Sequence, residues 1–153
     1  MNMTKLKEEI IADEGRMDEI YNCSMSVKTA GIGHAIRKSE PEYKLELGTK
    51  VSDKRIDEWF DSDIKSTIAD VKFLFPNISD IPEEGQRVLA NSCFQLGRNR
   101  LSHFVKLRKA VAEPYWWLSK EGKEKVAAEM KDSRWYKQTT NRVQRHIDRI
   151  LAL

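Results

Sequence analysis

The chain has 153 residues, and its 27 Lys and Arg against 24 Asp and Glu give a formal charge of +3. With 40% hydrophobic and 33% charged residues, the composition is that of a globular protein and excludes disordered and fibrous classes. The chain is long enough to bury a core without metals or disulfides. No apolar run approaches the roughly 20 residues that a membrane helix needs.

The N-terminal region and the cysteines predict the compartment in which the protein is made. Glu8 and Glu9 stand where a secretory signal would be apolar, so we expect synthesis in the cytosol without an export signal. Cys23 and Cys93 are too few for a disulfide framework and are expected to be thiols. A regulatory disulfide between them is the alternative, and it requires their Cα atoms to lie within about 7 Å. Residues 131–153 carry six basic and two acidic side chains, which gives weak support for an anionic partner.

The first half of the chain has a pattern of helix, hairpin lobe and long helix. Apolar residues at helical spacing predict a short helix with Thr4 as its cap and Gly15 as its end. Alternating residues and several glycines between positions 16 and 51 predict a small β-hairpin lobe. Ser52 is expected to cap a long helix that ends before Pro76.

The second half of the chain is expected to be helical. A core helix after Pro82 should end near Gly97, and a second helix should cover residues 101–111. Two more helices should include residues 126–130 and residues 140–151. The pattern therefore predicts an α+β protein with a mostly helical C-terminal part.

The segment from Asp13 to His34, DEGRMDEIYNCSMSVKTAGIGH, carries the most specific signal. Glu14 precedes a glycine, Cys23 follows nine residues later, Thr29 follows six further on, and a Gly-x-Gly-His turn ends at His34. This pattern resembles the phage-type lysozymes of glycoside hydrolase family 24. Two later blocks agree in the same order, FQLG at residues 94–97 and SRWYKQTTNR at residues 133–142.

The resemblance covers nearly the whole chain and implies a fold. It implies one lysozyme-like α+β domain over residues 1–153 with a cleft between two lobes. The expected parts are a small β-hairpin lobe (13–52), a larger helical lobe (1–12 and 72–153) and a long connecting helix (53–71).

The resemblance also assigns catalytic roles to Glu14, Cys23 and Thr29. Cleavage of a glycosidic bond needs an acid that protonates the leaving oxygen, and a carboxylic acid does so where a partly apolar site keeps it protonated. Glu14 stands where the predicted helix gives way to the hairpin lobe, at the lip of the expected cleft. A glutamate considered alone is usually an ordinary surface residue, whereas its place in this motif favours a catalytic role.

Cys23 stands where the better-known form of the motif has Asp. Two mechanisms of glycosidic-bond cleavage are then possible. A thiolate that attacks the anomeric carbon would give a retained product, whereas a water activated by Cys23 and Thr29 on the far face would give inversion. The resemblance favours the water route. An inert thiol and an ordinary strand threonine are the alternatives, and Cys93, on a predicted core helix, is expected to be of the inert kind.

Further residues match supporting positions of the family. The resemblance implies that Arg142 pairs with Glu14, and that His34 pairs with Asp63 in a stabilising rather than a catalytic contact. Each residue matched to the sugar-binding cleft could equally be an ordinary helix-end polar residue. These matched residues are Gln95, Gln138 and Thr139.

The implied function is that of an endolysin, a muramidase that hydrolyses the bond between N-acetylmuramic acid and N-acetylglucosamine in peptidoglycan during phage host-cell lysis. We expect a monomer with no metal or other cofactor, no membrane anchor and no nucleic-acid partner. It should stay in the host cytoplasm until a separate holin-type pore releases it to the periplasmic cell wall.

Three alternatives accompany this expectation. One is a catalytically inactive wall-binding protein of the same fold, and another is a lytic transglycosylase, which forms an anhydro sugar. The third and weakest is a basic helical nucleic-acid binder centred on Arg142, Arg145 and Arg149.

Overall fold

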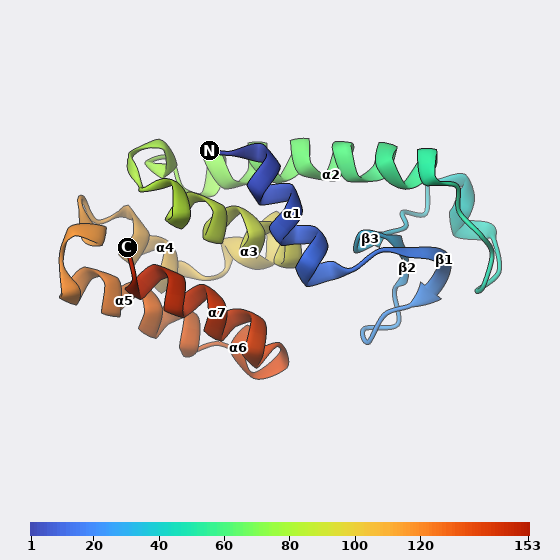
Figure 1. Cartoon of the computed structure of the whole chain (residues 1–153). Coiled ribbons are helices and arrows are strands. Elements are labelled where there is room, and N and C mark those ends of the chain that lie inside the picture. Colours follow the sequence, from blue (N-terminus) through green and yellow to red (C-terminus); the bar gives the residue numbers. More distant parts are fainter. The chain divides into compact units, whose positions relative to one another are not determined.

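The computed structural model describes all 153 residues, which form two compact units: residues 7–66, and residues 1–6 together with 67–153. Helices α1 (Met3–Glu14) and α2 (Asp53–Leu74) contribute residues to both units (Figure 1). No helix has the combination of length and apolar character needed to span a membrane. The predicted α+β class is confirmed, because the chain is mostly helical with one small antiparallel sheet.

The unit formed by residues 7–66 contains the whole sheet. Strands β1 (Met17–Asn22), β2 (Lys28–Gly31) and β3 (His34–Ala35) pair antiparallel in that order. Tyr21 lies directly opposite Thr29 in the ladder between β1 and β2. The expected hairpin lobe is therefore present, with three strands.

Two glycines make the return from β2 to β3. Gly31 and Gly33 have φ of +64° and +62°, in the left-handed region where a side chain is strained. A Cβ on Gly31 would lie 3.1 Å from Ile56 Cγ2, so the end of β2 packs directly on α2. The buried apolar side chains of this unit are Ile10, Ile20, Ala30, Ile32, Ile36, Val51, Ile56, Trp59, Phe60 and Ile64.

The ends of α1 and the start of α2 follow local hydrogen-bonding chemistry. Asn2 Oδ1 accepts a hydrogen bond from the backbone N–H of Lys5 at 3.0 Å, so the predicted cap at Thr4 is wrong. Gly15 ends α1 as predicted, with φ of +71°. Ser52 also caps α2 as predicted, because its Oγ accepts a backbone hydrogen bond from the first turn at 3.2 Å.

The other unit is helical. Helix α7 (Thr140–Leu151) packs against α3 (Glu83–Ser102), α5 (Lys120–Lys131) and α6 (Arg134–Gln138), and α4 (Val105–Ala112) packs against α5. The apolar stripes of these helices meet in the core of the unit. Its buried side chains include Val88, Leu89, Cys93, Leu101, Val126, Met130, Trp135, Val143, Ile147 and Ile150.

Gly97 interrupts α3 without ending it. Its φ of 74° and ψ of 160° break the helical path, and helical residues then resume. Leu101 therefore belongs to α3, and the helix expected over residues 101–111 begins only at Val105. The glycine was a correct signal for a break, but a break within a helix and a helix end have the same sequence signature.

Helix α6 is a short element that the periodicity did not predict. Ser133 Oγ accepts a hydrogen bond from the backbone N–H of Tyr136 at 3.0 Å and caps the helix. Trp135, only 1% exposed, fixes α6 to the core. This helix carries Gln138 and is followed directly by Thr139, two of the residues matched to sugar binding.

Candidate active site

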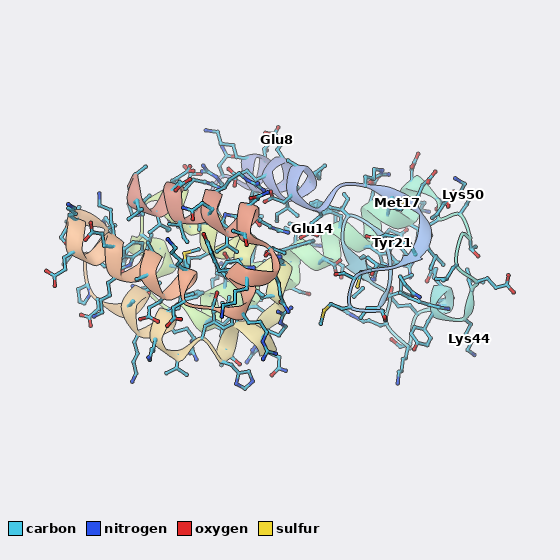
Figure 2. The ribbon with its side chains drawn as sticks, turned by 90° about the horizontal axis from the view of Figure 1, so that it is seen from below. Glu8, Glu14, Met17, Tyr21, Lys44 and Lys50 are labelled. Carbon is cyan, nitrogen blue, oxygen red and sulfur yellow. The ribbon has the colours of Figure 1, made fainter.

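Glu14 is the last residue of α1, at the point where the chain turns towards β1 (Figure 2). Gly33 lies directly against its carboxyl group, because a Cβ built on Gly33 would lie 2.8 Å from Glu14 Oε2 and 3.0 Å from Cδ. A side chain at position 33 would force the Glu14 carboxyl group to move. The Gly-x-Gly turn of the motif therefore lies directly against the Glu14 side chain.

Cys23 begins the turn between β1 and β2, and its backbone N–H donates to the Val27 carbonyl at 3.0 Å. Burial raises the pKa of the thiol, but hydrogen bonds from the backbone of Val27 and Met25 and from the Thr29 side chain outweigh it. The pKa of Cys23 therefore lies below its ordinary value. The side chain is partly exposed and forms no disulfide, so a thiolate there is accessible to a reactant.

Thr29 lies on β2 and is only 6% exposed. Its Oγ1 lies 2.8 Å from the Val27 carbonyl oxygen, within hydrogen-bond distance, and its side chain is also a hydrogen-bond partner of Cys23. The structure thus brings Cys23 and Thr29 together. The single hydroxyl proton of Thr29 goes either to the Val27 carbonyl or to the Cys23 sulfur.

Tyr21 is a residue of this site that the sequence argument missed. Its place opposite Thr29 puts the two side chains on the same face of the sheet. Burial raises the pKa of Tyr21, and the negative charges of Glu14 and Cys23 raise it further. A signal did exist: pairing a strand over residues 17–22 with the one at Thr29 would have identified Tyr21.

His34 follows the glycine turn and lies between two acidic side chains. Its Nδ1 is 2.7 Å from Asp63 Oδ2, and its Nε2 is 2.9 Å from Glu40 Oε1. The ring also stacks on Trp59, with centroids 4.4 Å apart and planes at 14°. The expected contact between His34 and Asp63 is present, and Glu40 is a second acidic partner that the sequence argument did not identify.

Two of the three residues matched to sugar binding lie together. Gln95 Oε1 accepts a hydrogen bond from Trp135 Nε1 at 2.8 Å, and Gln95 Nε2 donates to Thr139 Oγ1 at 3.2 Å. Gln138 is exposed and accepts a hydrogen bond of 3.4 Å from Arg100 Nη2. The Gln95 amide is thus held within the protein, whereas that of Gln138 is open to a ligand.

The remaining matched residue, Arg142, is buried in α7 and donates to Asn91 Oδ1 on α3 at 2.7 Å. Its pairing with Glu14 stays a prediction.

Cys93, also on α3, is 2% exposed, and burial raises the pKa of its thiol to about 12. Such a thiol is unreactive at neutral pH. No group of three or more His, Cys, Asp and Glu side chains is arranged to hold a metal ion.

Known proteins resemble this chain over nearly its whole length. The model of the Phage lysozyme family matches residues 12–149. "Probable T4-type lysozyme 2" of Dictyostelium discoideum is 27% identical over 164 residues, covering 95% of this chain and 92% of the relative. "Probable T4-type lysozyme 1" of the same organism is 24% identical over 167 residues with the same coverage. The matched region includes Glu14, Cys23 and Thr29, and the chain therefore belongs to the phage lysozyme family of glycoside hydrolases.

Proposed function

We propose that this lysozyme hydrolyses the bond between N-acetylmuramic acid and N-acetylglucosamine in peptidoglycan. The observation that carries the proposal is the Glu14 carboxyl group, which lies against Gly33. The negative charges of Glu14 and Cys23 both raise the pKa of Tyr21. A carboxyl group and a second ionisable group around one site suit the cleavage of a glycosidic bond.

The proposed reaction assigns one proton transfer to each group. Glu14 gives its proton to the leaving oxygen as the bond from that oxygen to the anomeric carbon breaks. A water molecule forms the new bond to the anomeric carbon, and its proton passes to the Cys23 thiolate. The lowered pKa of Cys23 supports this role, because it increases the fraction of thiolate at neutral pH.

The test uses purified peptidoglycan, the wild-type chain and two matched variants. Glu14→Gln removes the proposed acid, and Glu8→Gln makes the same change at an exposed position of the same helix. We expect mass spectrometry to find fragments with reducing N-acetylmuramic ends from the wild type and Glu8→Gln. The rate for Glu14→Gln should fall by about a hundredfold or more, since general acid catalysis typically contributes ~10²–10⁴-fold.

Other products would support the alternative functions. Anhydro ends in place of reducing ends would identify a lytic transglycosylase and overturn the hydrolase proposal. Wall binding without fragments, from wild-type protein that thermal unfolding shows to be folded, would identify an inactive wall-binding protein.

We also propose that the enzyme serves phage host-cell lysis as a monomer that crosses the inner membrane through a separate holin-type pore. The description of the matching family as phage lysozyme supports this setting. Expression inside a Gram-negative bacterium should cause lysis only when a pore-forming protein is expressed with it, and never with Glu14→Gln. Lysis without a pore would overturn the dependence, and sedimentation as a dimer would overturn the monomer.

A further inference from the structure

The segment that joins α4 to α5 carries aromatic side chains at the surface of the helical unit (Figure 1). It includes the short 3₁₀ helix η3 (Trp116–Leu118). Tyr115, directly before η3, is 67% exposed, and its ring packs edge-on against Trp117 with centroids 5.8 Å apart. An exposed aromatic ring leaves a large apolar surface in water, so a cluster of this kind is a candidate binding surface.

The backbone of Tyr115 is held in a strained conformation. Its φ of +57° lies in the left-handed region, which costs free energy for a residue with a side chain. A side chain at position 122 would collide with the Trp116 carbonyl, so α5 packs directly on this segment at Gly122. The packing of α5 therefore supports a conformation that the segment alone would not favour, and such strain occurs most often at functional sites.

Tyr115 also lines a cavity of about 210 Å³ formed by the end of α4, the joining segment and the start of α5. Sites for drug-sized ligands measure ~300–1,000 Å³, so this cavity suits a smaller group. Trp116 is a second lining residue, and its buried Nε1 has no hydrogen-bond acceptor within the protein. Unpaired buried donors are rare, and a bound molecule is one source of an acceptor. None of the lining residues is one that the family resemblance assigns to catalysis or to sugar binding.

The polar groups around the cavity offer both acceptors and donors of hydrogen bonds. Glu113 and Glu121 contribute carboxylate oxygens. Ser119 contributes a hydroxyl group and Lys125 an ammonium group. Lys125 Nζ lies 3.7 Å from Glu113 Oε1 with both side chains 58% exposed, and so weak an ion pair can exchange for contacts with a ligand. Two carboxylates against one ammonium group disfavour an anionic ligand.

A sugar ring has the chemistry that matches this cavity. Each of its hydroxyl groups both donates and accepts a hydrogen bond, and the C–H groups on a face of the ring pack on an aromatic side chain. We propose that the cavity is a carbohydrate-binding site, which holds one sugar ring of a glycan strand against Tyr115 in addition to the sugars of the bond that is cleaved. This inference rests on the proposed function, which supplies the glycan strand as the ligand.

The test measures binding by NMR and needs no hydrolysis. The probe is a trimer of N-acetylglucosamine, titrated into Glu14→Gln protein so that the probe is not consumed. Tyr115→Asn removes the ring with a residue that tolerates the left-handed backbone, and Tyr115→Phe keeps the ring. Leu118→Ala is the matched control, because Leu118 is 74% exposed in the same segment but does not line the cavity. Circular dichroism with thermal unfolding checks that each variant is folded.

We expect saturable chemical-shift changes at the backbone amides of residues 113–125. Tyr115→Asn should weaken this binding about tenfold, the order of magnitude of one lost aromatic contact. Tyr115→Phe and Leu118→Ala should bind as the parent protein does. With Glu14 restored, Tyr115→Asn should raise KM for insoluble peptidoglycan by about threefold, whereas Leu118→Ala should keep the wild-type KM.

Three other outcomes decide against a part of the proposal. A titration without shifts at residues 113–125, or equal binding by Tyr115→Asn, would overturn the site. Shifts produced there by the stem peptide of peptidoglycan, and none by the sugar, would overturn the choice of ligand. Because binding is measured without turnover, a wild-type protein that releases no reducing ends, alongside intact sugar binding at the cavity, would contradict only the proposed hydrolysis.

Discussion

His34 Nδ1 lies 2.7 Å from Asp63 Oδ2, and this contact ties β3 to α2. The other ring nitrogen faces Glu40, which also accepts hydrogen bonds from Trp59 Nε1 and Arg55 Nη2. The His34 side chain is only 6% exposed, so these charged contacts are sheltered from solvent and are stronger than surface ion pairs. The network therefore couples the stability of the chain to pH.

The first prediction follows from the direction of the pKa shift at His34. Burial lowers the pKa, but the hydrogen bonds and charges of Asp63 and Glu40 outweigh it and raise the pKa above the ordinary 6.5. The stabilisation is therefore complete below about pH 6.5 and is lost as the pH rises through the folded-state pKa. We expect His34→Gln to lower the free energy of unfolding by about 2 kcal/mol at pH 5.5 and by less at pH 8.5.

Glu40 contributes to the low-pH limit of this stabilisation. Burial raises the pKa of Glu40, but hydrogen bonds from the Arg37 backbone and from His34 and Trp59 lower it below the ordinary 4.5. Its contribution is present above about pH 4.5 and is lost as the pH falls through the folded-state pKa. Urea unfolding from about pH 2.5 to 9 measures both limits, with exposed His103→Gln as the control. A His34→Gln deficit that stays constant across this range would contradict the charge-based account.

The second prediction concerns the contact between Gly33 and Glu14. An alanine at position 33 would carry its Cβ 2.8 Å from Glu14 Oε2 and would also occupy a left-handed conformation. The backbone strain should cost about 1–2 kcal/mol of stability. The displaced carboxyl group should lower kcat by about tenfold or more.

Gly48 provides the matched control for this change. It has a φ of +86°, but nothing lies within 4 Å of a Cβ built there. Gly48→Ala should therefore lose similar stability and keep its activity, as measured by thermal unfolding and peptidoglycan turnover. Equal losses of activity in the two variants would show that Gly33 acts through the backbone rather than through Glu14.

The sequence predicted those parts of the fold and site that depend on neighbouring residues. Helical periodicity correctly placed α2 and α7, because apolar stripes are a local property of the chain. The motif placed Glu14 at the junction of helix and sheet, because a helix end and a glycine are local signals. The unreactive environment of Cys93 also followed from its place on a predicted apolar face.

The parts that the sequence did not predict depend on pairing between distant segments. Tyr21 became part of the site only through the register that sets it against Thr29. Glu40 became a partner of His34 because the loop after β3 returns to the imidazole ring. The five residues of α6 are too few for a periodic pattern, so that helix was missed as well.

The third prediction separates two residues that the family resemblance treats alike. Both ends of the Gln95 amide are engaged, by Trp135 and Thr139, so Gln95→Ala leaves a buried indole N–H without its acceptor. We expect a loss of about 1–3 kcal/mol in stability. Gln138→Ala, at an exposed position, should keep full stability and raise KM for peptidoglycan. Urea unfolding and steady-state kinetics test both variants, and a purely kinetic effect of Gln95→Ala would contradict this division.

The fourth prediction contrasts the two thiols. Cys23 is partly exposed with a lowered pKa, whereas Cys93 is buried with a pKa raised to about 12. Iodoacetamide at pH 7.5 should therefore alkylate only Cys23 in the folded protein, and activity should fall in step with the modified fraction. Peptide mapping by mass spectrometry identifies the modified residue.

Controls for the thiol prediction come from the same site. Folded Cys23→Ser should resist alkylation, and the same variant in urea should react at Cys93. Thr29→Val should slow the alkylation of Cys23, because the Thr29 side chain is one of the hydrogen-bonding groups that lower the pKa of this thiol. Full activity after complete modification of Cys23 would exclude the thiolate from the reaction, since the alkylated sulfur can no longer accept the proton of the attacking water.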